Sequence, residues 1–273
     1  MAASPGGARP TVVVRGGGDL ATGTALRLFR AGMRVVVTEL CAPLAVRRTV
    51  SFAEAVYEGA WTVEGVEARL AASATEALAL AARRVVPVLV APDVTGLLEE
   101  LAPDVLVDAR LTKREVEPLR RRGMLVIGLG PGFAAGSNCD AVVETRRGHT
   151  LGRVYWTGAA LADTGLPDGD PRRVLRAPTA GVVRSSARIG ELVSEGQKVA
   201  EVDSCPVTSP FAGVLRGMVR DGLSVAQGMK IGDVDASGER SRCFLVSDKA
   251  LAVGGGVLEA IVSAFHAGRL ASR

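Results

Sequence analysis

The chain has 273 residues and a net charge of +4, and 48% of its residues are hydrophobic, which is typical of a globular protein with an apolar core. Four cysteines lie far apart with no CxxC pair, which argues against a structural zinc site and a disulfide framework. The sequence has no basic stretch interleaved with aromatic residues and no apolar run of about 20 residues. We therefore expect a cytoplasmic protein that binds neither nucleic acid nor a membrane and holds no metal.

The first predicted elements are a strand, a glycine-rich turn and a helix. Residues 11–15 form a β-branched run typical of a buried parallel strand. An amphipathic helix is predicted over 24–31, and a second strand over 34–38 ends at Glu39. The turn between the first strand and the helix contains Gly16, Gly17, Gly18, Asp19, Leu20 and Ala21.

This order of elements is typical of a dinucleotide-binding site. Gly16 would form the tight turn, Gly18 would let the backbone approach a pyrophosphate, and Ala21 would allow close packing of helix and strand. The helix N-terminus would attract phosphate, and Glu39 would bind ribose hydroxyls, which favours NAD over NADP. Asp19 argues the other way, because a carboxylate in the turn would repel phosphate. A Rossmann-type domain that binds no nucleotide is therefore the alternative.

Further strands are predicted over 85–91, 105–108 and 124–129, with a helix over 94–101. The ends of parallel strands gather at one crevice. Asp108 and the loop containing Gly130 and Gly132 are therefore candidate ligand residues there, although an aspartate can also cap a helix and glycines can simply turn the chain. Arg47 and Arg48 follow the predicted ribose position and are suited to grip an anion, unless they are a solvated pair on a helix.

The second half of the sequence contains an internal repeat. Residues 177–203 align with residues 209–235 at an offset of 32, with 12 identities in 27 positions. Each unit is predicted to form short strands separated by glycine turns, and two such units would close on each other as a small β barrel or sandwich. The spacing resembles the biotinyl/lipoyl barrel-sandwich domain.

The junction between the two units lacks the lysine that a carrier domain requires. We therefore expect no covalent biotin or lipoate, and Lys198 and Lys230 are predicted to be structural. Cys205 lies at the junction, where a thiol could carry sulfur or selenium or could be incidental.

After the repeat, Ser247 is expected to cap a helix over 247–266. Gly254-Gly255-Gly256 within it could be a hinge, a tight packing point or an anion-binding turn. These elements predict a Rossmann-type nucleotide-binding domain over 1–152. A duplicated barrel-sandwich domain with a C-terminal helix is predicted over 153–273.

Several segments, taken together, resemble a known family. The chain resembles the YqeB-like accessory proteins of selenium-dependent molybdenum hydroxylase systems, whose Rossmann part is similar to XdhC-type maturation proteins. The segments that carry the resemblance are 15–23 (RGGGDLATG), 47–59 (RRTVSFAEAVYEG), 63–68 (VEGVEA), 128–133 (GLGPGF), 143–154 (VETRRGHTLGRV), 230–235 (KIGDVD) and 247–260 (SDKALAVGGGVLEA). The sequence departs from the pattern after Asp235, where Ala236 and Ser237 stand in place of an expected proline and arginine.

The resemblance implies an accessory or maturation protein for a molybdenum hydroxylase, which would bind a nucleotide or nucleotide-bearing cofactor. Its partners would be the hydroxylase or other maturation proteins, and a homo-oligomer is left open. The resemblance also makes Arg47, Arg48 and the segment 144–149 (ETRRGH) ligand candidates. Within this segment, His149 is suited to act as an acid or base near neutral pH or to bond a carbonyl at the domain junction. Two other functions stay open, an NAD-dependent oxidoreductase and a scaffold without a small ligand, and no catalytic residue is identified.

Overall fold

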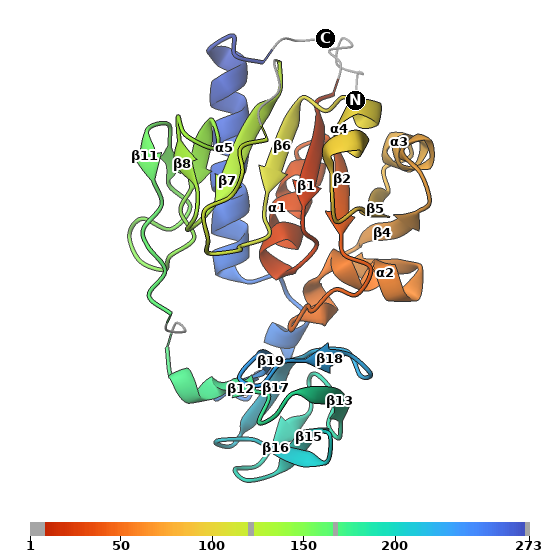
Figure 1. Ribbon diagram of the computed structural model, residues 1–273, viewed down its shortest axis with the longest axis vertical. Helices are drawn as coiled ribbons and strands as arrows, with labels where there is room; N and C mark the ends of the chain where they lie inside the picture. Colours follow the sequence, from red (N-terminus) through yellow and green to blue (C-terminus); the bar gives the residue numbers. More distant parts are fainter. Residues whose placement is uncertain (1–8, 120–122, 166–168, 271–273) are drawn as a thin grey trace.

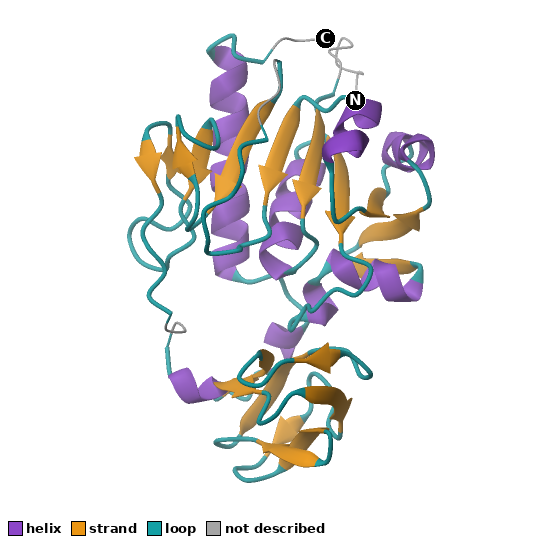
Figure 2. Ribbon diagram, viewed as in Figure 1, coloured by secondary structure: helices purple, strands orange, loops and turns teal. Residues whose placement is uncertain are grey.

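The structure is a computed structural model that describes residues 9–119, 123–165 and 169–270. A large body built on one sheet stands above a smaller body of antiparallel strands (Figure 1). The chain passes from the large body to the small one and returns to it with its last helix (Figure 2).

The large body contains a nine-stranded mixed sheet with the order β10-β9-β7-β6-β1-β2-β5-β4-β3. Its inner strands pair in parallel, whereas β3 and β10 add antiparallel strands at the two edges. The β-branched and aliphatic runs in the central strands are buried on both faces, as expected for parallel strands. The strands are β1 (Thr11–Arg15), β2 (Arg34–Glu39), β3 (Ala60–Val63), β4 (Val66–Ala71), β5 (Val86–Val90), β6 (Val105–Asp108), β7 (Leu125–Leu129), β9 (Ala141–Val143) and β10 (Val154–Tyr155). Beside them, β8 (Ala134–Ala135) and β11 (Gly158–Ala159) form a separate two-stranded sheet.

Helices cover both faces of this sheet. The helices α1 (Asp19–Arg30) and α5 (Asp248–His266) lie side by side on one face. The helices α3 (Ala74–Ala82) and α4 (Thr95–Leu101) pack with the apolar residues of the other face, and α2 (Ala55–Glu58) lies near β3 and β4. Helix α1 begins earlier than predicted, directly after Gly18, so that the glycine turn leads into its first residue.

The glycines of α5 are a tight packing point. A Cβ at Gly254 would lie 2.9 Å from the carbonyl oxygen of Gly23 in α1, and one at Gly23 would lie 2.6 Å from the Cβ of Ala250 in α5. Close contact of the two helices therefore requires small residues at these positions. By length and composition alone α5 could cross a membrane. Its inner side, however, is buried in the apolar core of the large body, as in a core helix.

The small body contains two four-stranded antiparallel sheets, which follow the sequence repeat. In the sheet β16-β15-β13-β18 and in the sheet β12-β19-β17-β14, two strands of one half of the repeat lie in the middle, and one strand of the other half lies at each edge. At the offset of 32, β13 corresponds to β17, β14 to β18, β15 to β19, and β12 to β16. Their bounds are β12 (Val174–Arg176), β13 (Gly181–Ser185), β14 (Leu192–Val193), β15 (Lys198–Val202), β16 (Cys205–Thr208), β17 (Gly213–Met218), β18 (Ser224–Val225) and β19 (Lys230–Asp235).

The segment 46–58 of the large body attaches the small body. Within it, the hydroxyl of Thr49 donates to the carbonyl of Cys243 at 2.6 Å. Arg220 pairs with Glu54 at 2.7 Å and with Glu58 at 2.6 Å. Because Glu54 is only 2% exposed, the ion pair with Arg220 is shielded from solvent and holds the two bodies together. Short 3₁₀ helices occur at Arg48–Val50 and Phe52–Glu54 in this segment, and others at Pro171–Arg173 and Arg240–Cys243 in the small body.

The predicted fold class, a Rossmann-type parallel sheet followed by a barrel-sandwich domain with a C-terminal helix, is wrong. The sheet is mixed, with antiparallel strands at both edges, and several antiparallel sheets accompany it. In the described residues no helix connects β6 to β7 or β7 to β9, and α5 from the end of the chain covers that part of the sheet instead. A glycine turn between strand and helix defines only a local unit, and it cannot specify how a distant helix completes the sheet. The predicted division at residue 152 stays a prediction.

Candidate functional site

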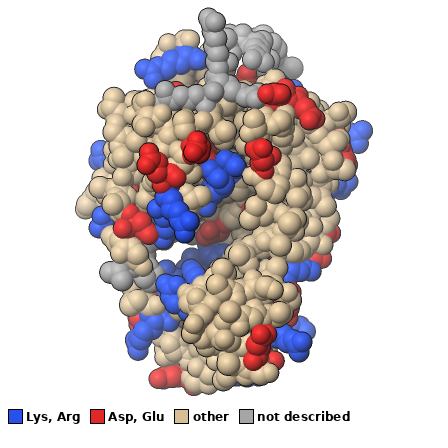
Figure 3. All heavy atoms as spheres, in the orientation of Figure 1, with Lys and Arg blue, Asp and Glu red and all other residues tan. Residues whose placement is uncertain are grey.

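A cleft rich in cationic side chains lies between the two bodies. This basic cleft has a volume of about 640 Å³. Figure 3 shows Lys and Arg side chains gathered around the hollow between the upper and lower bodies. Six cationic side chains and two carboxylates line the cleft: Arg47, Arg147, Arg173, Arg216, Lys230, Lys249, Asp19 and Asp233. This excess of positive charge favours an anionic ligand.

Two helices begin at the basic cleft. Gly18, Asp19 and Leu20 at the start of α1 line it, as do Ser247 and Lys249 at the start of α5. In the part of the chain that the structure describes, no acceptor bonds the amides of Gly18, Asp19 and Leu20. Unpaired amides and the partial positive charge of a helix N-terminus together attract anions.

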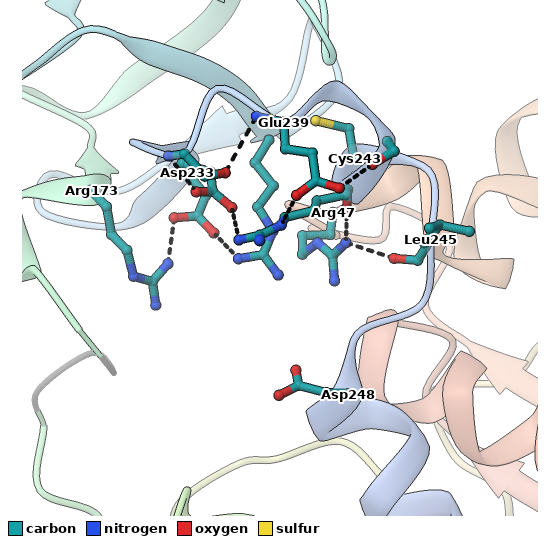
Figure 4. A network of polar contacts seen from close by, with 12 residues as sticks. Arg47, Arg173, Asp233, Glu239, Cys243, Leu245 and Asp248 are labelled. Carbon is teal, nitrogen blue, oxygen red and sulfur yellow. Dashed lines mark hydrogen bonds and ion pairs between the residues drawn. The ribbon is translucent and has the colours of Figure 1, made fainter.

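Arg47 is the most deeply buried of these cations, at 7% exposed. Its Nη2 donates to the carbonyls of Arg242 at 2.8 Å and Leu245 at 3.0 Å, and Figure 4 shows it among the residues of this network. Its Nη1 lies 3.7 Å from Asp19, beyond hydrogen-bond distance, and neither Nη1 nor Nε has a hydrogen-bond partner. Burial and then the nearby Arg216 lower the pKa of Arg47. The structure thus holds a buried guanidinium with unused donors at the cleft wall.

The small body contributes a second cationic group around Asp233, which is only 2% exposed. Asp233 pairs with Arg173, and the Nη1 of Arg216 lies 4.0 Å from it (Figure 4). The Nε of Arg216 is buried without a hydrogen-bond partner. Desolvation within the cleft lowers the pKa of Lys230, although the residue as a whole remains exposed. One carboxylate thus stands among three cations and neutralises them only in part.

Arg147 and Asp248 form a bidentate ion pair at the start of α5, with both bonds 2.8 Å long. The hydrogen bonds from Arg147 hold the pKa of Asp248 far below its usual value. The pair places Arg147 at the mouth of the basic cleft and in a neighbouring hollow that Arg216 and Arg242 also line.

The crevice predicted at the strand ends exists, but its amides are partly occupied. It has a volume of about 470 Å³ and joins the basic cleft at residues 18–20. The Gly17 amide donates to Glu39 at 2.6 Å, and the other oxygen of Glu39 accepts from the Leu40 amide at 2.8 Å. The Gly16 amide donates to the carbonyl of Thr38 at 2.8 Å. Glu39 therefore braces the glycine turn, and the free amides begin at Gly18.

The structure separates the other predicted site residues. Asp108 is buried and pairs with Arg110 at 2.6 Å. Arg48 pairs with Glu54 at 3.5 Å rather than lining the basic cleft beside Arg47. Gly130 and Gly132 have positive φ and pack tightly against Thr145 and Arg114.

His149 is exposed in a loop, and Ala21 lines the crevice. Arg147, which the resemblance made a candidate, lines the basic cleft, whereas sequence reasoning missed Arg173, Arg216, Lys230 and Lys249. Arg216 and Lys230 were visible in the repeat, but nothing in the sequence showed that only one repeat unit faces the large body.

Comparison with curated protein sequences identifies a relative of this chain. No protein-family profile matches the chain. The chain is 46% identical over 266 residues to the "Uncharacterized protein YqeB" of Escherichia coli K12, and the match covers 96% of this chain and 49% of that protein. The chain thus spans about half the length of this relative. The similarity supports a YqeB-like protein, and the link to selenium-dependent molybdenum hydroxylases stays a prediction.

Solved structures give only weak likenesses. An aspartoacylase family protein from Mesorhizobium loti shows 11% identity and a TM-score of 0.27, covering 83% of this chain and 85% of that one. A succinylglutamate desuccinylase/aspartoacylase from Rhodobacter sphaeroides shows 14% identity and a TM-score of 0.26, covering 84% and 85%. Scores this low carry no argument about fold or chemistry.

Proposed function

We propose that this protein binds a nucleotide or a nucleotide-bearing cofactor, with a phosphate group held in the basic cleft. The observation that carries the proposal is Arg47, a buried guanidinium with two donor nitrogens that have no hydrogen-bond partner. A buried donor without an acceptor is costly, and a phosphate is an acceptor that would use both donors at once. The phosphate would also accept from the free amides at the start of α1.

The adjoining crevice supports a nucleotide rather than a bare phosphate. It meets the basic cleft at Gly18, and much of its lining is apolar, including Leu40, Pro43, Leu44 and Pro92. A base and ribose are suited to such a surface, since small-molecule sites combine apolar walls with a few polar groups. The ligand would thus cross from the crevice to the basic cleft over Gly18.

The wider role that we propose is that of an accessory protein in the maturation of a selenium-dependent molybdenum hydroxylase. This role is supported by the sequence resemblance described above. It is tested by deleting the gene in a host that makes such a hydroxylase and measuring hydroxylase activity per enzyme molecule. Full activity in the deletion strain would exclude the role.

The binding site itself is tested by titrating AMP, ADP, ATP and NAD into the purified protein by calorimetry. Arg47→Gln should weaken the binding of a phosphate-bearing ligand about 10- to 100-fold, because it removes charge-assisted hydrogen bonds. Gly18→Val should abolish binding, because the new side chain would stand in the passage between the crevice and the basic cleft. A Cβ at Gly18 meets no atom within 4 Å, so the side chain begins in open space.

The matched control is Arg184→Gln, which removes an exposed arginine at the repeat position equivalent to Arg216. It should leave the affinity unchanged. If the Arg47 and Gly18 variants bind every ligand as tightly as the unaltered protein, or if none of the four ligands binds, the basic cleft is not a nucleotide site.

A further inference from the structure

The basic cleft continues into a further cationic hollow on its far side. This distal pocket has a volume of about 390 Å³, and it shares Leu20, Arg173, Lys230 and Lys249 with the basic cleft. Beyond these shared residues, its charged lining consists of three cations, Lys113, Arg146 and Arg176, and one carboxylate, Asp163. The two hollows therefore adjoin each other at the shared residues, and we refer to them together as the channel.

The cations of the distal pocket are only partly neutralised. Lys113 pairs with Asp163 at 3.1 Å, and Arg176 donates to the carbonyl of Gly228 at 2.9 Å, which leaves its charge without a carboxylate partner. The guanidinium of Arg146 has no hydrogen bond or ion pair among the described residues. Positive charge that is only partly neutralised is suited to a second anionic group.

The shared wall suggests that both anionic groups belong to one ligand. Lys230 lies between the two hollows and lines both. Asp233, the carboxylate of the basic cleft that lies among Arg173, Arg216 and Lys230, does not line the distal pocket. An extended anion could therefore run from Arg47 past Lys230 to Arg146, with cationic side chains at both ends and between them.

We infer that the channel takes a ligand with at least two separate anionic groups, one held at Arg47 and the other in the distal pocket. The inference rests on the proposed function and names its ligand class: a nucleoside carrying a polyphosphate, or a cofactor with a second phosphate, in preference to a nucleoside monophosphate. Each of the three hollows then binds one part of the ligand. The crevice binds the base and ribose, the basic cleft binds the first phosphate, and the distal pocket binds the second anionic group.

The test compares AMP with ATP as probes, by calorimetry at fixed ionic strength. ATP should bind about tenfold more tightly than AMP, the difference expected from one or two added charge-assisted contacts at a partly exposed site. The variant Arg146→Ala/Arg176→Ala should remove most of this advantage and leave AMP affinity within about twofold. Both residues are exposed, so circular dichroism should show an unchanged fold.

A matched control separates location from overall charge. Arg184→Ala/Arg188→Ala removes the same number of charges from exposed positions of the first repeat unit, outside the channel. It should leave both affinities and their ratio unchanged. If the distal variant weakens AMP and ATP equally, or has no more effect than the control, the two-anion inference is wrong while the nucleotide site stands. If neither probe binds in a way that depends on Arg47, the proposed function and this inference both fail.

Discussion

The two repeat units of the small body share a sequence pattern but occupy different surroundings. In the second unit, Arg220 bonds buried Glu54, Lys230 and Arg216 line the basic cleft, and Gly217 packs on the large body. The equivalent residues of the first unit (Arg188, Lys198, Arg184 and Ser185) do not line the basic cleft, and Lys198 pairs locally with Glu201 at 2.6 Å. A repeated residue can thus keep its strand position while only one copy acquires a tertiary role.

The comparison also separates residues that serve the packing of the strands from residues that line the basic cleft. Gly181 and Gly213 are both crowded, since a Cβ at either would clash, against Asp203 in one unit and Asp235 in the other. Such pairs serve the fold in both units. Arg184 and Arg216 are identical in type, yet only Arg216 has a buried nitrogen without a partner and faces the basic cleft. Substituting equivalent positions in pairs therefore tests each assignment.

The largest difference is expected between Arg220→Ala and Arg188→Ala. Arg220→Ala leaves the carboxylate of Glu54 buried with only Arg48 nearby, at 3.5 Å, and should cost about 3 kcal/mol of unfolding free energy. Arg188→Ala should change stability by less than about 0.5 kcal/mol because the residue is exposed. Urea unfolding of both variants measures the difference. Equal effects would mean that the ion pair with Glu54 does not hold the two bodies together.

Exchanging the residues at a second pair of equivalent positions, 185 and 217, should lower the free energy of unfolding by somewhat less. In Gly217→Ser, the residue of the first unit is placed in the second, where a Cβ would lie 2.8 Å from the carbonyl oxygen of Val46. The resulting overpacking should cost about 2 kcal/mol. The reverse exchange, Ser185→Gly, should cost about 0.5–1 kcal/mol through chain entropy. Thermal unfolding measures both, and a stable Gly217→Ser variant would show that the contact with Val46 yields easily.

Ligand affinity should distinguish the two repeated lysines. Lys230→Met should weaken ATP binding about tenfold, because it removes a cation from the wall that the two hollows share. Lys198→Met removes the same charge on the exposed unit and should leave binding unchanged. Calorimetric titration of the two variants side by side is the measurement. If both lose affinity to the same extent, only the overall charge matters, and the position of Lys230 does not.

The smallest effect is a pH dependence of stability. Desolvation lowers the pKa of Lys230 below 10.5, so protonation of this lysine is less favourable in the folded protein than in the unfolded chain. The penalty is complete below the folded pKa and disappears as the pH rises through it towards 10.5. Lys230→Met should therefore gain a few tenths of a kcal/mol at pH 7 after solvent screening, and this gain should shrink by pH 10.5. Urea unfolding across this pH range would refute the prediction if the gain is constant or grows.

Local features of the fold could be predicted from the sequence, whereas its assembly could not. The β-branched run at 11–15, the glycine turn and the short strands of each repeat unit depend on residues that are close in sequence. The structure has a strand at 11–15, a helix that begins directly after the turn, and antiparallel strands in both repeat units. The return of α5 to the large sheet depends on the packing of Gly254 against Gly23, which are 231 positions apart in the chain and carry no periodic signal. The fold class was wrong because such contacts decide it.

The candidate site was predicted in part for the same reason. Arg47 and Gly18 lie near one another in sequence, and the pattern of a strand, a turn and basic residues singled them out. Glu39 was expected to bind ribose, but it accepts from the Gly17 amide because the turn itself needs a hydrogen-bond partner there. The cations of the small body could not be assigned to the site, because a repeat does not reveal which of its copies faces the rest of the molecule.

The position of α5 has a consequence for how the chain folds during synthesis. This helix is synthesised long after β1, and it covers one face of the sheet to which that strand belongs. Until α5 emerges from the ribosome, the apolar residues beneath it stay open to solvent and to other chains, so the partly made sheet must wait for this helix or be shielded by a chaperone. A premature stop before residue 248 would therefore yield an aggregating product, even though every strand had been made.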